Sequence, residues 1–174
     1  MDPIARLRSV REMAANLGFD LHTHVHSVVK RYPKAREAEE VQMEDEGQVI
    51  RLERTRSVGG GGEPVIYSLD VFPQRFVIGV SDESAWSGSL MRLMEVSWGI
   101  TITHAEVTTH AARLAPQIAS RIRVRLNLPW ITLEQTNFDA HQRRVLYSLD
   151  YYRGDTFSFR LLRDRASIGQ EITK

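Results

Sequence analysis

The sequence predicts an α+β fold in which an antiparallel sheet is flanked by helices and built from two similar halves. A repeat carries this prediction, because the segment from Val49 to Asp70 is echoed by the segment from Trp130 to Asp150. Each copy has the pattern of two strands joined by a turn, and each follows a helix-like segment. Two such units can bury their apolar sheet faces by joining into one sheet with pseudo-twofold symmetry.

Length and composition point to a single soluble domain. With 174 residues, the chain can close over one hydrophobic core. No apolar run approaches the roughly 18 residues of a membrane span, and the N-terminus is too charged for a secretory signal, so we expect a cytoplasmic protein. The absence of cysteine excludes disulfides, thiol catalysis and Cys-ligated metals. With 23 Lys and Arg against 22 Asp and Glu, this chain alone should bind DNA poorly.

The N-terminal half is expected to contain two helices and three strands. Ser9 and Glu12 form a capping box, and Gly18 can end the short helix that follows. Residues 20–30 alternate with the period of a strand, and residues 34–46 are rich in Ala, Glu and Arg, which favours a solvated helix. Strands over residues 48–58 and 65–72 flank four glycines, which suit an antiparallel hairpin.

The C-terminal half is expected to repeat this order. Ser87 or Ser89 can cap a helix that runs to Ser97 and ends at Gly99. A strand over residues 100–109 precedes a helix that starts at Pro116 and extends to about residue 126. Strands over residues 131–138 and 145–152 form the second hairpin, and a last strand is expected over residues 156–162.

Two arginines share a face of the strand over residues 48–58. Period two places Arg54 and Arg56 after the apolar residues of one face, and Gln135 and Asn137 take the matching positions in the second copy. A buried arginine needs a partner, and its planar guanidinium matches a carboxylate or phosphate. The pair therefore suggests an anion-binding site. The alternatives are an exposed strand end, or a permanent ion-pair network with one of three acidic residues, Asp70, Asp150 or Glu106.

The remaining motifs give no catalytic site. His22, His24 and His26 share one strand face, which fits a transition-metal site or, more simply, the polar face of an edge strand. The glycine run lacks the Lys-Ser/Thr ending of a phosphate loop, and the chain contains no hydrolase elbow, zinc-protease helix or dinucleotide fingerprint. We therefore expect no catalytic residue, no metal and no cofactor.

Several segments together resemble the UTRA domain, the ligand-binding domain of the HutC branch of GntR-type transcription regulators. The resemblance covers residues 4–163, and its most specific part is the ending Tyr-Tyr-Arg-Gly-Asp-x-Phe-x-Phe at residues 151–159. The other matching segments are residues 7–12, 50–56, 63–67, 87–90 and 145–150. The resemblance implies a fold like that of chorismate lyase, an antiparallel sheet with flanking helices and an internal duplication.

The resemblance also implies a site for an anionic effector such as a sugar phosphate or a carboxylate. In sugar-phosphate-sensing members, matching positions hold the phosphate, the organic part and an aromatic lining. Here these positions are Arg54 and Arg56, Arg8 and Ser9, and Ser87 and Ser89 for the phosphate, Ser68 for the organic part, and Tyr152 for the lining. Where such members carry acidic residues on the two hairpins, this chain has Ser68 and Leu146.

For the whole regulator, the resemblance implies a homodimer and an N-terminal winged-helix domain that binds DNA. This chain is expected to hold the ligand-binding domain over residues 1–163 and a polar tail over residues 164–174, without the winged-helix domain. Either that domain has been removed, or the chain is a freestanding sensor. The implied role is effector sensing without catalysis; the alternative is a chorismate-lyase-like enzyme that shares the fold.

Overall fold

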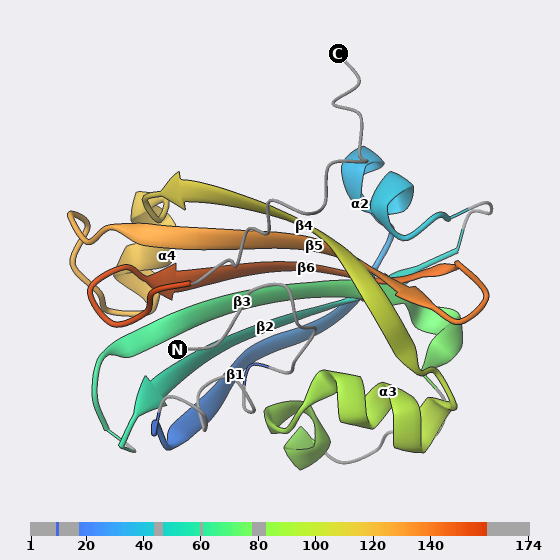
Figure 1. Ribbon diagram of the computed structural model, residues 1–174, viewed down its shortest axis with the longest axis horizontal. Coiled ribbons are helices and arrows are strands. Elements are labelled where there is room, and N and C mark those ends of the chain that lie inside the picture. Colours follow the sequence, from blue (N-terminus) through green and yellow to red (C-terminus); the bar gives the residue numbers. More distant parts are fainter. Residues whose placement is uncertain (1–9, 11–17, 44–46, 60, 78–82, 160–174) are drawn as a thin grey trace, which may run out of the picture.

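The computed structural model describes residues 10, 18–43, 47–59, 61–77 and 83–159, which form a six-stranded antiparallel sheet with helices on both faces (Figure 1). The strand order is β1-β2-β3-β6-β5-β4. The strands are β1 (Leu21–Arg31), β2 (Val49–Val58), β3 (Pro64–Pro73), β4 (Ile102–Ala112), β5 (Trp130–Asp139) and β6 (Arg144–Arg153). The helices are α2 (Ala35–Glu40), α3 (Leu90–Trp98) and α4 (Pro116–Arg121), with 3-10 turns η1 (Gln74–Phe76) and η2 (Glu83–Ser87). The predicted α+β class is confirmed.

The sheet has the predicted pseudo-twofold duplication. The order β1-α2-β2-β3 recurs as β4-α4-β5-β6, and the two halves join where β3 pairs with β6. At the centre of this pairing Leu69 lies opposite Leu149, with each half contributing the same residue type. Antiparallel pairing around this point places Ser68 opposite Asp150 and Asp70 opposite Ser148.

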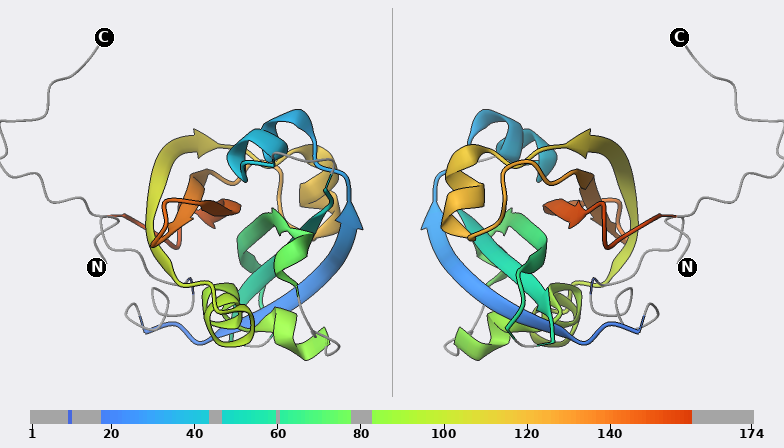
Figure 2. Two further views of the ribbon diagram at one scale, coloured as in Figure 1. Left: turned by 90° about the vertical axis from the view of Figure 1, so that its right-hand side faces the viewer. Right: turned by 90° about the vertical axis from the view of Figure 1, so that its left-hand side faces the viewer.

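One face of the sheet carries α3, and the opposite face carries α2 and α4 (Figure 2). Under α3, Leu90 and Met94 pack with Leu52 and Phe72 in the first apolar cluster. The same face ends in a second apolar cluster at the other end of the strands: Leu21, Val65, Ile66, Leu133, Tyr152 and Phe157. Burial of both clusters drives sheet and helix together.

Helix α3 begins and ends where its local signals predict. The Ser89 hydroxyl accepts a hydrogen bond from the backbone N–H of Arg92 at 3.3 Å, which satisfies one free donor of the first turn. Gly99 ends the helix with a φ of 65°, a left-handed conformation that glycine adopts without steric cost. Both sequence predictions are confirmed.

On the opposite face, each helix reaches the strands of the other half. Arg36 of α2 binds Glu134 of β5, while Arg121 of α4 binds Glu53 of β2. Each carboxylate also accepts a hydrogen bond from a tyrosine hydroxyl. Tyr67 donates to Glu53 at 2.8 Å, and Tyr147 donates to Glu134 at 2.6 Å. This duplicated Tyr-Glu-Arg contact interlocks the halves, so they form one domain.

Several predicted boundaries differ from the structure. Helix α4 ends at Arg121 because Arg123 takes a φ of 59°, which turns Val124 and Leu128 into the core around Trp130. Helix α2 ends at Glu40, several residues before the predicted end. The predicted helix after Ser9 lies outside the described residues except for Val10 and Gly18.

The predicted last strand is wrong over residues 156–159. There the chain turns after β6, and Phe157 packs edge-on against Phe19 and Tyr152, with ring centroids 5.7 and 5.3 Å apart. Aromatic packing thus replaces strand pairing at this point, and residues 160–162 lie outside the described part.

Among the described helices, none is long and apolar enough to span a membrane.

Candidate functional site

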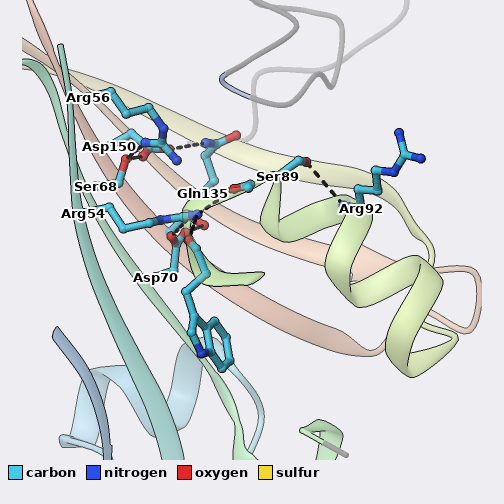
Figure 3. Close-up of polar contacts among 11 residues, drawn as sticks. Arg54, Arg56, Ser68, Asp70, Ser89, Arg92, Gln135 and Asp150 are labelled. Atoms are coloured by element: carbon cyan, nitrogen blue, oxygen red, sulfur yellow. Dashed lines mark hydrogen bonds and ion pairs between the residues drawn. The ribbon is translucent and has the colours of Figure 1, made fainter. Parts of the chain in front are cut away.

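Polar side chains occupy the centre of the α3 face, between the two apolar clusters. Period two on β2, β3, β5 and β6 turns them all to this face, and six of them come together in Figure 3. The members of this polar centre are Arg54, Arg56, Ser68, Asp70, Gln135, Ser148 and Asp150. Two arginines and two aspartates with at most 4% exposure form a rare arrangement, because buried charge is costly unless it is neutralised.

Arg54 is held by three acceptors. Its Nη2 lies 2.6 Å from an Asp70 oxygen, and its Nη1 donates to the backbone carbonyls of Trp86 at 3.1 Å and Gly88 at 3.0 Å. The permanent ion pair considered from the sequence is therefore present for Arg54. It also attaches the segment before α3 to the middle of the sheet.

Arg56 is bound much less completely. Its Nη1 donates to the Ser68 hydroxyl at 2.6 Å, and its buried Nε, like the Nε of Arg54, has no hydrogen-bond partner among the described residues. Among the described residues no carboxylate lies within ion-pair distance of this guanidinium. Burial, followed by the charge of Arg54, lowers the pKa of Arg56 to about 10, so Arg56 is a cation in need of an anion.

Asp150 is linked to Arg56 through the Ser68 hydroxyl. One oxygen accepts the Ser68 hydroxyl, and the other accepts the Gln135 amide at 3.3 Å. Burial, followed by the charge of Asp70, raises the pKa of Asp150 to about 6. The Ser148 hydroxyl donates to Asp70 at 2.8 Å, which mirrors the contact of Ser68 with Asp150.

The other predicted site residues have separate contacts. Tyr152 lies opposite Ile66 beside this polar centre and is 2% exposed; burial and then the charge of Asp150 raise its pKa well above 10. The Ser87 hydroxyl donates to the Ser84 carbonyl at 2.7 Å, and Ser89 caps α3. Arg8 and Ser9 lie outside the described residues, so their predicted role is not tested.

Two further candidates lie elsewhere. Glu106 is exposed on β4 and takes part in none of the ion pairs of the described residues. His26 bonds Thr55 at 2.9 Å and packs edge-on against His24 with ring centroids 4.6 Å apart. Within the described part of the chain, no group of three His, Asp or Glu side chains could hold a metal. His22, His24 and His26 all lie on β1, an edge strand of the sheet.

The sequence predictions missed Ser148 and the contacts that join Ser68 to Asp150. The repeat held the necessary signal. Ser68 corresponds to Ser148 and Asp70 to Asp150, and antiparallel pairing places each serine opposite the other copy's aspartate when Leu69 faces Leu149. Register between the hairpins had to be known before this could be deduced.

Known proteins resemble the chain in sequence and in fold. The family model of the UTRA domain matches residues 16–158. The effector domain of PhnF from Mycobacterium smegmatis superposes with a TM-score of 0.81 at 19% identity, over 94% of this chain and 98% of that one. A GntR-family transcriptional regulator from Enterococcus faecalis gives 0.70 at 22% identity, over 81% and 99%. A Streptomyces coelicolor structure gives 0.71 at 27% identity, over 84% and 97%. Comparison with curated protein sequences gives no match.

Proposed function

Because this chain belongs to the UTRA domain family, the ligand-sensing domains of GntR-type regulators, we propose that it binds a small anionic metabolite and transmits this binding to DNA. The proposed effector is a sugar phosphate or a carboxylate. The chain acts as a sensor, not as an enzyme, and reaches DNA only through a winged-helix domain. HutC-branch membership and a cytoplasmic location are part of the same proposal.

The observation that carries the proposal is the state of Arg56. The Arg56 guanidinium is 4% exposed, its Nη1 contacts only a neutral hydroxyl, and it forms no direct ion pair with any described residue, although Asp150 and Asp70 lie near enough to act on its charge. A phosphate or carboxylate oxygen would supply two parallel hydrogen bonds and neutralise the charge. Arg54, by contrast, already has its carboxylate and serves mainly to hold Asp70 and the segment before α3 in place.

Arg54 offers a path from ligand to helix. An anion at Arg56 would lie next to Arg54 on the same strand face. Arg54 in turn donates hydrogen bonds to the backbone carbonyls of Trp86 and Gly88, just before α3. In this proposal, Ser87 at the end of η2 and Ser89 at the start of α3, together with Arg8 and Ser9, bind the anion. A coupling of about 1–3 kcal/mol between ligand and DNA would change operator affinity about 5- to 150-fold.

We also propose that the domain forms a homodimer, since regulators with two half-sites need a twofold pair. The sheet order leaves β1 and β4 as its edges, and an edge strand has backbone groups free for pairing with another copy. Light scattering at tens of micromolar is expected to give twice the mass of 19.9 kDa. A monomer mass at that concentration contradicts the dimer.

A thermal-shift panel of phosphorylated and carboxylated metabolites tests the proposed function. We expect at least one anion to raise the melting temperature of the wild-type protein and to leave Arg56→Ala unaffected. Arg92→Ala is the matched control, because Arg92 is exposed on α3 and its side chain is outside the polar centre. No shift with any anion, or equal shifts in wild type and Arg56→Ala, would overturn the proposal.

A further inference from the structure

We propose that Asp150 determines ligand specificity: the effector is a zwitterion whose anionic group binds Arg56 and whose ammonium group binds Asp150. The inference rests on the proposed function, since it takes Arg56 as the anion-binding group. It adds a second recognition element on the opposite side of Ser68. The chemical class is a compound in which a phosphate, sulfonate or carboxylate stands a few atoms from an amine.

Charge balance is the first argument. The direct ion pair at 2.6 Å makes Arg54 and Asp70 neutral together. Arg56 and Asp150 are left to balance one another without touching, since the Ser68 hydroxyl stands between them. A ligand with only a negative charge would neutralise Arg56 and leave Asp150 as an unbalanced charge in a buried site, which is unfavourable. A ligand that also brings a positive charge avoids this cost.

The second argument is the direction of the two hydrogen bonds that Ser68 makes. Its oxygen accepts a hydrogen bond from Arg56 at 2.6 Å, and its hydroxyl proton is donated to Asp150. Ser68 therefore presents an acceptor to one side and a donor to the other, joined through one atom. A zwitterion bound here would extend the same pattern, with acceptor oxygens toward Arg56 and donor hydrogens toward Asp150.

The other contacts of Asp150 leave room for a donor. A carboxylate has about four lone-pair positions, and Ser68 and Gln135 use two of them, with Gln135 at a long 3.3 Å. The elevated pKa of Asp150, about 6, agrees with a carboxylate that lacks a direct cation. The charged groups around Asp150 are Arg54, Arg56 and Asp70. Arg54 and Asp70 form an ion pair with each other, and Arg56 donates to Ser68.

Calorimetric titration with three matched pairs tests the inference. The pairs are O-phosphoethanolamine with ethyl phosphate, taurine with ethanesulfonate, and β-alanine with propionate, which differ in the ammonium group. For at least one pair we expect the wild-type protein to bind the ammonium compound about tenfold or more tightly, as one charge-assisted hydrogen bond provides. Asp150→Asn should bring this ratio close to one. Asp155→Asn, an exposed aspartate paired with Arg153, is the control and should keep the ratio.

The possible failures are distinguishable. If no compound of the three pairs binds, the anion site fails and this inference fails with it. If an anion binds equally well with and without the ammonium group, or if Asp150→Asn keeps the preference, only the zwitterion inference fails. Circular dichroism checks that the variants are folded, and the wild-type comparison decides the question even if Asp150→Asn does not fold.

Discussion

Ser68 of the first hairpin donates its hydroxyl proton to Asp150 of the second, across the strand pairing that joins the two halves. The reverse contact, from Ser148 to Asp70, completes a symmetric core of four side chains. The halves differ one strand further out, where the first has Arg54 and the second Gln135. The duplication thus gives symmetric Ser–Asp contacts, whereas both arginines of the polar centre come from the first half.

Arg54→Ala should destabilise the protein by about 3–5 kcal/mol. The change leaves Asp70 buried without its cation and removes the donor of the Trp86 and Gly88 carbonyls. Urea unfolding measures the loss, and the exposed Arg92→Ala should stay within about 0.5 kcal/mol of wild type. A similar, small effect of both variants would mean that the Arg54 ion pair is not a structural element.

Arg56→Ala should cost less stability than Arg54→Ala, because Arg56 makes a single hydrogen bond and has no ion pair with the described residues. Removing this cation should also raise the pKa of Asp150 further. Arg56 and Arg54 both lower that pKa through their charges, and the effect of Arg56 is the larger. Urea unfolding of the two variants side by side, followed by carboxyl titration in NMR spectra, gives both quantities. Equal losses of stability would contradict the assigned difference between the arginines.

The stability of the wild-type protein should depend on the protonation of Asp150. Its folded-state pKa of about 6 exceeds the ordinary 3.8, so the folded protein holds this proton more tightly than the unfolded chain. The resulting stabilisation is present below about pH 4 and is lost as the pH rises through about 6, by at most about 3 kcal/mol.

Asp150→Asn should lack this loss, because an amide does not ionise. The free energy of unfolding of the variant minus that of wild type should therefore increase between pH 4 and pH 7. Urea titrations at both pH values measure it, with Asp155→Asn as the control. A difference that stays constant, or that decreases with pH, would show that the Asp150 pKa is not raised.

Glu53→Gln should destabilise the protein more than Glu134→Gln. Glu53 is 1% exposed and accepts from Tyr67, Arg51 and Arg121, whereas the side chain of Glu134 is 16% exposed. An amide keeps the shape but loses the charge, so a loss of about 1–3 kcal/mol is expected at the buried site. Thermal unfolding of the two variants compares them. The opposite order would contradict the assigned role of the Arg121–Glu53 contact in joining the halves.

The repeat was enough to predict the four strands of the two hairpins and the pseudo-twofold sheet, since period and turn residues are local properties. The capping of α3 by Ser89 was equally local. The different roles of Arg54 and Arg56 were not predictable, because both occupy the same face of one strand. Only the registers of β2 against β3 and of β3 against β6 show that Asp70 reaches Arg54, whereas Asp150 contacts Ser68. Boundaries set by aromatic packing, such as that at Phe157, also needed the tertiary structure.

The measurement that tests the central claim most directly is calorimetric titration of wild type and Arg56→Ala with glucosamine 6-phosphate and with glucosamine. This pair differs in the phosphate alone. The account predicts that the wild-type protein binds the phosphorylated sugar at least about a hundredfold more tightly, the equivalent of about 2.7 kcal/mol, and that Arg56→Ala loses this difference. Equal binding of the two sugars by wild type, no binding of either, or an undiminished phosphate preference in Arg56→Ala would contradict it.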